Sequence, residues 1–235
     1  MIERIPFDAL GHADHGWLQA RHHFSFAEYH DPHRMGLGPL RVWNDDTIAP
    51  GTGFDMHPHK DMEIITYVRD GAITHKDHLG NEGRTEAGDV QVMSAGTGIV
   101  HGEWNREVEP TRIFQIWIRP AERGVAPHWD QRRFPKADRA GALVPLASGR
   151  AAEIAAGALE IHQDAALHGA SLAPGQSLAH PLDAARRGYL VVARGSVTVN
   201  GTALGERDAA TIRDTDMLII AAGAETAEIL LADLA

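Results

Sequence analysis

Short runs rich in β-branched and aromatic residues, separated by turn residues, dominate the chain from Leu40 onward. Glycine, aspartate and asparagine stand between runs of four to seven residues, and this punctuation predicts an all-β barrel or sandwich. The run at 112–118 is apolar at successive positions, which predicts a strand buried on both faces. The runs in the first half are Leu40–Trp43, Glu63–Val68, Ala72–His75, Val90–Ser94 and Arg112–Ile118.

The second half of the chain resembles the first. The tetrapeptide Ile-Ala-Pro-Gly at 48–51 recurs as Leu-Ala-Pro-Gly at 172–175, and the segments 67–71 and 191–195 match at the same offset of 124. Gly88-Asp89 matches Arg207-Asp208 at an offset of 119. We therefore expect two copies of one β unit. The expected boundaries are residues 1–130 for a metal-binding N-terminal domain, 131–150 for a proline-containing linker and 151–235 for a C-terminal domain without metal ligands. The β-rich runs of the second half are Ala158–Gln163, Tyr189–Val192, Ser196–Val199, Met217–Ile220 and Glu228–Leu231.

Composition excludes several classes of function. The formal net charge of −10 argues against nucleic-acid binding, because an acidic chain repels the phosphate backbone. We expect no membrane span and no signal peptide, since no window approaches ~18 consecutive apolar residues and the N-terminus lacks a basic-then-apolar pattern. The absence of cysteine excludes disulfides and thiolate metal sites, and we expect a cytoplasmic protein. With 15 histidines, any transition metal would have nitrogen and oxygen ligands.

Two pairs of candidate metal ligands stand at i,i+2 spacing in the first half. His57 and His59 would face the same side of an extended strand, and Pro58 favours extended backbone at His57. His101 and Glu103, which follow a glycine-rich turn, share a face in the same way. On neighbouring strands the two pairs would offer three imidazoles and one carboxylate to a single divalent iron, manganese, nickel, copper or zinc ion.

Other polar residues receive weaker interpretations. Glu63 shares parity with His59, and we interpret it as a hydrogen-bonding partner of a ligand, with a fifth ligand as the alternative. Pro181 and Asp183 stand in the second half where the first histidine pair would fall, so a metal is expected only in the first half.

The segment from His22 to His33 carries interleaved aromatics and could cover a cavity mouth. Pocket lining is one role for Phe24, Phe26, Met93 and Val42, although core packing is favoured for each. We expect surface positions for His12, His15, His75, His78, His128 and His168.

The spacing G-x5-H-x-H-x3-E over 51–63, followed by Gly71, resembles the first signature motif of the cupin superfamily. The surrounding sequence resembles the pirin family over about residues 20–120, and the second half resembles that family more loosely. This resemblance implies a bicupin of two antiparallel jelly-roll barrels, with metal in the N-terminal barrel. The family's ligands correspond to His57, His59, His101 and Glu103, whereas many other cupins use the glutamate at position 63. The segments that carry the resemblance are 21–29, 44–46, 51–68, 75–77, 88–105 and 115–120.

Bacterial pirin-like proteins are similar to quercetin 2,3-dioxygenases, which open a flavonol ring with O2 and release carbon monoxide. The resemblance thus implies a metal enzyme with a flavonol such as quercetin and O2 as substrates, iron(II) as the favoured metal, and Glu103 as the base for the flavonol 3-hydroxyl. One alternative is a non-catalytic, metal-containing regulator that binds a protein partner, and another is isomerisation or hydrolysis with zinc. A closed aromatic-lined pocket would favour a small molecule, and a large apolar patch beside the metal would favour a protein.

Overall fold

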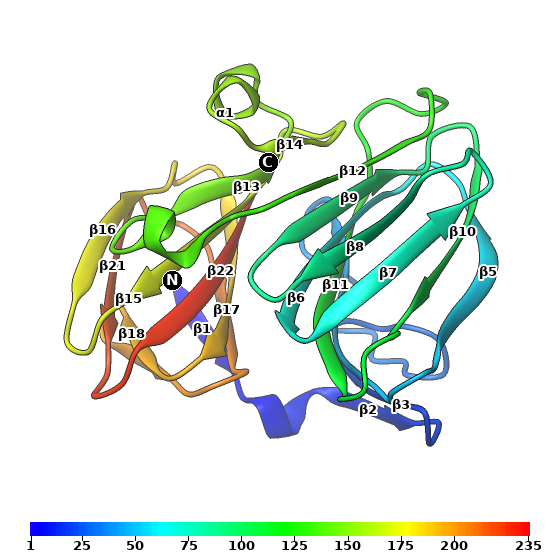
Figure 1. Cartoon of the computed structure of the whole chain (residues 1–235). Coiled ribbons are helices and arrows are strands. Elements are labelled where there is room, and N and C mark those ends of the chain that lie inside the picture. Colours follow the sequence, from blue (N-terminus) through cyan, green and yellow to red (C-terminus); the bar gives the residue numbers. More distant parts are fainter. The chain divides into compact units, whose positions relative to one another are not determined.

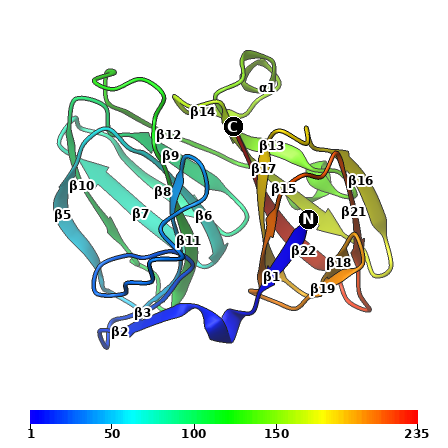
Figure 2. The same cartoon turned by 180° about the vertical axis from the view of Figure 1, so that it is seen from behind.

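The computed structural model describes all 235 residues, and almost all of its regular elements are strands (Figures 1 and 2). This confirms the all-β expectation. The chain divides into two compact units, which are described separately. The N-terminal unit comprises Gly11–Phe134 and Leu159–Gln163, and the C-terminal unit comprises Met1–Leu10, Pro135–Ala158 and Asp164–Ala235. Neither unit contains a helix with the length and apolar character that crossing a bilayer requires.

Two antiparallel sheets enclose the core of the N-terminal unit. The larger sheet has the order β12-β9-β6-β11-β4-β3-β2, and the smaller has the order β5-β10-β7-β8. Ile48, Val68 and Ile113 of the larger sheet pack with Ile73 and Phe54 of the smaller, so the core lies between them. The strands are β2 (Gly11–Asp14), β3 (Leu18–His22), β4 (Leu40–Ile48), β5 (Gly53–His59), β6 (Glu63–Asp70), β7 (Ala72–Asp77), β8 (Glu82–Glu86), β9 (Val90–Ser94), β10 (Ile99–Trp104), β11 (Thr111–Ile118) and β12 (His128–Arg132), with β14 (Leu159–Glu160) from the later segment.

The C-terminal unit has the same plan. Its larger sheet contains β1, β20, β17, β22, β15 and β13 in this order, its smaller sheet has the order β16-β21-β18-β19, and apolar side chains of both sheets form one core. The strands are β1 (Ile2–Ile5), β13 (Val144–Ser148), β15 (Ala165–Leu172), β16 (Ser177–Pro181), β17 (Arg187–Arg194), β18 (Val197–Val199), β19 (Thr202–Leu204), β20 (Ala209–Ile212), β21 (Met217–Ala222) and β22 (Ala227–Leu234). The helices are α1 (Ala151–Ala155) and two short 3-10 helices, Phe7–Ala9 and Lys136–Arg139.

Equivalent turns recur in the two units at the offsets found in the sequence. Gly51 and Gly175 both have φ of +70°, a left-handed conformation that glycine adopts without a steric cost. β6 and β17 span positions that differ by 124 at both ends. The N–H of Gly88 donates to the Val68 carbonyl, just as that of Arg207 donates to the Val192 carbonyl. These shared hydrogen bonds support the duplication of one β unit. The offset falls from 124 to 119 after this point because the β18–β19 hairpin is shorter than the corresponding β7–β8 hairpin.

The two units also differ from the expected division at three places. β1 lies at the start of the chain yet pairs with β20, from Ile2 opposite Ile212 to Ile5 opposite Ala209. β13 comes from the stretch expected as a linker and pairs with β15. Of the expected run at 158–163, only Leu159–Glu160 is a strand. Proline content suggested a linker, but Pro145 stands at a register irregularity of the β13–β15 pairing, and a proline is tolerated at such an irregularity.

Candidate metal centre and adjoining cavity

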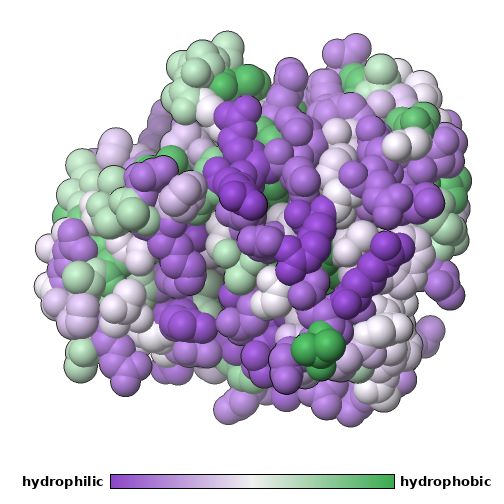
Figure 3. All heavy atoms as spheres, viewed as in Figure 1, coloured by the Kyte–Doolittle hydropathy of each residue, from purple (hydrophilic) through white to green (hydrophobic).

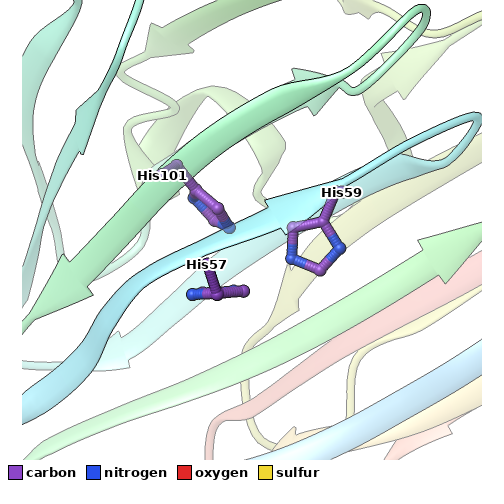
Figure 4. A group of neighbouring side chains, drawn as sticks. All are labelled: His57, His59 and His101. Atoms are coloured by element: carbon purple, nitrogen blue, oxygen red, sulfur yellow. The ribbon is translucent and has the colours of Figure 1, made fainter.

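Three histidines on two neighbouring strands of the smaller sheet face one another (Figure 4). The ligand-capable nitrogens of His57, His59 and His101 all lie within 4.8 Å of one another. The first two belong to β5, and His101 on β10 lies directly opposite His57 in the antiparallel register. Alternation along β5 and pairing with β10 therefore bring the three predicted histidines together.

Hydrogen bonds orient two of these rings. Nδ1 of His57 lies 2.6 Å from the backbone carbonyl of Asp55, so Nδ1 donates there and Nε2 is left as the ligand atom. Nδ1 of His101 lies 3.3 Å from Nδ1 of His75, whose Nε2 lies 3.1 Å from the Asp77 carboxylate. If His75 donates to Asp77, its Nδ1 accepts from His101. The buried Nε2 of His101 has no hydrogen-bond partner, and a metal ion would satisfy it.

The position of His75 corrects the expectation that it lies on the surface. Its side chain is fully buried on β7, where the ring stacks on Trp129 with 4.7 Å between ring centroids. Asp77, its carboxylate partner, also accepts a hydrogen bond from the Asn81 amide at 2.9 Å. The polar hairpin sequence concealed this role, although His75 and Asp77 do stand at the i,i+2 spacing that places both side chains on one face. His78, in the same hairpin, is exposed as expected.

Glu103 is buried on β10 two residues after His101, and it lies outside the compact group of three histidines. Its carboxylate accepts hydrogen bonds from Gln115 at 2.8 Å, Gln91 at 2.5 Å and Thr66 at 3.3 Å. Burial raises the pKa of Glu103 to about 7, although these three hydrogen bonds act in the opposite direction. The structure thus provides a buried carboxyl group held by three hydrogen bonds, and its roles as ligand and base stay predictions.

The three donors to Glu103 belong to a polar row that the sequence did not reveal. In the larger sheet, Asn44 lies opposite His22 on one side and Gln115 on the other. Gln115 lies opposite Thr66, which in turn lies opposite Gln91. The members of such a row face the same side of the sheet, here the interior between the sheets. Asn44 is also within 2.9 Å of the His22 ring, so the polar groups of the row are held in place.

Glu63 faces away from this row, which corrects its interpretation as a partner of a ligand. The turn before β6 contains Asp61 with φ of +48°, so the parity shared with His59 is lost. The Glu63 carboxylate instead accepts from the Ser94 hydroxyl at 2.5 Å and lies 3.6 Å from Nδ1 of His162. Glu63 and the row member Thr66 are three residues apart on β6, and they therefore point to opposite faces.

The remaining histidines divide between surface and interior. His12 and His15 are exposed as expected, and His128 is partly buried. His168 was expected at the surface but is buried in the C-terminal unit, where Nε2 lies 3.2 Å from a Glu153 carboxylate oxygen and the ring contacts His180. His168 occupies a strand position that faces the barrel interior, and the contact with Glu153 gives its buried Nε2 a hydrogen-bonding partner.

A cavity of about 590 Å³ adjoins the histidine group. Four of its lining residues are aromatic: Trp117 contacts His59 edge-on at 4.9 Å and Phe26 at 5.4 Å, and Trp17 contacts Phe54 at 5.2 Å between ring centroids. The segment after His22 thus contributes to the wall, as considered from the sequence. The lining residues are His15, Trp17, Leu18, Ala20, His22, Phe26, Ala27, Asn44, Asp46, Gly53, Phe54, Asp55, His57, His59, Gln115 and Trp117.

Of the four apolar residues weighed for the pocket, only Phe26 lines it. Phe24, Met93 and Val42 are buried in the core, which was the favoured expectation for each.

Comparison with known proteins agrees with this geometry. Residues 6–118 match the pirin family, and residues 146–234 match the quercetinase C-terminal cupin domain. A pirin-like protein of Caulobacter vibrioides is 60% identical over 235 residues, covering 100% of both chains. The quercetin 2,3-dioxygenase of Escherichia coli K12 is 44% identical over 235 residues, covering 100% of this chain and 99% of its own.

A solved structure gives the same answer for the fold. The bacterial pirin YhhW of Escherichia coli in complex with nickel(II) matches with a TM-score of 0.92 and 42% identity, covering 100% of this chain and 99% of that one. Together with the two domain matches, this confirms the expected bicupin architecture. The chain belongs to the pirin family.

Proposed function

We propose that this protein is a metal-dependent dioxygenase that opens the ring of a flavonol with O2 and releases carbon monoxide. The observation that carries the proposal is the group of three histidines beside an aromatic-lined cavity of about 590 Å³. Cavities of roughly 300–1,000 Å³ with aromatic walls and a few polar groups are typical of small-molecule sites. The activity named for the Escherichia coli relative supports the same chemistry.

We propose His57, His59 and His101 as metal ligands and Glu103 as the fourth. The unpartnered, buried Nε2 of His101 and a donor set of nitrogen and oxygen fit a divalent transition metal. The complex of the related bacterial pirin with nickel(II) supports a divalent metal for this chain. Iron(II) is the metal we propose for this chain, with nickel, manganese, copper and zinc as the alternatives to compare.

Side chains of the protein can accept the proton of the flavonol 3-hydroxyl and orient the substrate. When bound, the metal would supply positive charge that favours ionisation of a chelating hydroxyl group. We assign acceptance of the 3-hydroxyl proton to Glu103, a buried carboxyl group two residues from His101 that hydrogen bonds from Gln115, Gln91 and Thr66 hold in place. Trp117 and Phe26 would flank a planar ring at the cavity wall and keep water from it.

The distribution of exposed apolar residues favours a small molecule over a protein partner. On the face drawn in Figure 3, hydrophilic residues predominate and hydrophobic ones form scattered groups. The large hydrophobic side chains that are exposed lie on different elements or loops, except for two that share β21: Met1, Met35, Met56, Leu79, Val108, Met217 and Ile219. A protein-binding surface normally presents a larger contiguous patch.

The test combines metal analysis with turnover. The apo-protein is loaded separately with iron, manganese, nickel, copper or zinc, and quercetin loss, O2 uptake and carbon monoxide release are followed. We expect equal amounts of quercetin consumed and carbon monoxide released with at least one redox-active metal. His57→Ala should lose most bound metal, whereas Glu103→Gln should lose turnover more than metal. A filled site without turnover for any metal would overturn the proposal and favour the non-catalytic regulator.

A further inference from the structure

Asp46 is a buried carboxyl group on the cavity wall that the mechanism above does not use. It lies on β4, is 2% exposed, and its Oδ1 has no hydrogen-bond partner. Its register partners on the two flanking strands are Ala20 and Ile113, both apolar. The preceding residue, Asp45, faces the other side of the sheet and forms an ion pair with Arg69 at 2.9 Å. Only one of these adjacent aspartates is therefore compensated by a cation.

The surroundings of Asp46 are unfavourable for a carboxyl group without a ligand. Ala20 and Ile113 belong to an apolar cluster against which Trp17 and Phe54 also pack. Burial, and then the negative charges of Asp45 and Glu103, raise the pKa of Asp46. A buried polar atom without a partner costs free energy, and a bound ligand that donates a hydrogen bond to Asp46 would remove that cost.

The neighbouring polar residues of the interior are already paired and leave Asp46 to a ligand. The Asn44 side chain lies 2.9 Å from His22, and the Gln115 amide donates to Glu103 at 2.8 Å. Asp46 lies one row further along the same face, where the cavity walls are Trp17 and Phe54. This part of the cavity thus offers aromatic walls and the buried, unpartnered carboxyl oxygen of Asp46, whereas Asp55, the other carboxyl group of the lining, is exposed.

We propose that Asp46 accepts a hydrogen bond from a phenolic hydroxyl on a substrate ring that does not react, and thereby selects polyhydroxylated flavonols. This inference rests on the proposed function, because it assumes a flavonol held at the metal centre. An aryl hydroxyl needs one acceptor, whereas an ammonium group must satisfy three N–H bonds, and Ala20, Ile113 and Phe54 supply no acceptor side chain. A flavonol that lacks the hydroxyl would leave Oδ1 unpaired, which disfavours its binding.

The test compares three flavonols on four proteins with the same metal content. 3-Hydroxyflavone carries only the chelating hydroxyl, galangin adds two on the fused ring, and quercetin adds two more on the pendant ring. The proteins are the wild type, Asp46→Asn, Asp46→Leu, and Ile113→Val as a matched packing control in the adjacent strand. Both kcat/KM under O2 and Kd by anaerobic calorimetry are measured.

We expect Asp46→Leu to lower kcat/KM and raise Kd for quercetin by about 10- to 100-fold, the effect of leaving a hydrogen-bonding group unpaired. The values for 3-hydroxyflavone should change by less than about threefold, and Asp46→Asn, which keeps an acceptor of the same shape, should lie between. Ile113→Val should change all three flavonols by the same factor. If Asp46→Leu also lowers kcat/KM for galangin, the recognised hydroxyl lies on the fused ring. If galangin instead behaves like 3-hydroxyflavone, that hydroxyl lies on the pendant ring.

An equal loss for all three flavonols in both Asp46 variants would overturn the inference, because it would mark a structural role. A wild type that binds 3-hydroxyflavone as tightly as quercetin would overturn it as well. The two proposals fail separately. Selective binding that Asp46→Asn weakens, without any turnover, would uphold Asp46 and reject the dioxygenase. Turnover of all three flavonols without selectivity among them would uphold the dioxygenase and reject the role of Asp46.

Discussion

At the scale of the residue, the proposed metal centre depends on groups that do not touch the metal. His57 is oriented by a backbone carbonyl, and His101 by His75, which is itself tied to Asp77. Each hydrogen bond sets which ring nitrogen carries the proton and therefore which one can act as a ligand. Glu103 is positioned in a comparable way by amide and hydroxyl donors from the opposite sheet.

Replacing His75 tests whether it positions His101. His75→Phe keeps a ring against Trp129 but removes the nitrogen that accepts from His101. We expect metal affinity to fall by about 10- to 100-fold, the usual cost of losing a hydrogen bond to a ligand. Competition with a chelator measures it. Lys76→Ala is the matched control, because that exposed neighbour faces the other side of β7. Wild-type affinity in His75→Phe would contradict the role.

The raised pKa of Glu103 predicts a pH dependence of stability in the metal-free protein. The folded state holds this proton up to about pH 7, whereas the unfolded state releases it near the ordinary glutamate pKa of 4.5. The free energy of unfolding therefore falls as the pH rises through this interval, by roughly 3 kcal/mol from this group. Glu103→Gln should remove that slope, as urea unfolding between pH 4.5 and 7 will show. Parallel curves for the two proteins would contradict the prediction.

At the scale of the element, the site depends on the close approach of β5 and β10. A Cβ atom added at Gly53 would lie 2.2 Å from the Glu103 carbonyl oxygen and 2.5 Å from the Trp104 Cα. Both are backbone atoms, so the strands would have to separate. The β5–β10 register also shifts between His101 and Glu103, so the pairing of the two strands is irregular at the same place. The glycine thus allows the histidines of two strands to converge.

Gly53→Ala should therefore weaken both stability and metal binding. Overpacking of this kind costs about 1–3 kcal/mol, and displacement of β5 moves two ligands relative to the third. Thermal unfolding and a metal titration measure the two effects. Gly205→Ala is the control, because a Cβ atom there would meet nothing closer than the Asp208 carboxylate at 3.6 Å. An unchanged melting temperature and metal affinity in Gly53→Ala would show that the strands tolerate the added methyl group.

At the scale of the whole molecule, the chain order and the division into units do not coincide. The first strand completes a sheet whose other strands come from beyond residue 135. Besides its pairing with β20, this segment is held by Asp208, which forms an ion pair with Arg4 at 2.8 Å and accepts from the Phe7 N–H at 2.8 Å. The integrity of the C-terminal unit therefore depends on the N-terminal residues.

Deletion of residues 1–5 should destabilise the C-terminal unit and leave metal binding in the N-terminal unit within about twofold, because distant sites act independently. Hydrogen exchange should show lost protection of the amides in β20, whose edge becomes unpaired. Arg4→Ala separates the ion pair from the strand pairing, and it should cost less than about 1 kcal/mol at this half-exposed position. Unchanged protection of β20 in the truncated protein would contradict the prediction.

Local sequence determined those features that follow from alternation along a single strand. The shared face of His57 and His59, the buried central strand at 112–118 and the repeated turns at 51 and 175 were all readable in this way, because period two is a local rule. The prediction for Glu63 was wrong because it extended the alternation of β5 across the turn at Asp61, where φ is positive and the alternation is interrupted.

Only the tertiary structure decided which distant residues meet. The support of His101 by His75, the row that holds Glu103 and the position of Asp46 between apolar neighbours each depend on strand register. The assignment of β1 to the C-terminal unit depends on it as well. Register between strands far apart in the chain is set by the packing of whole sheets and by loop geometry, and composition or spacing within one segment does not contain it.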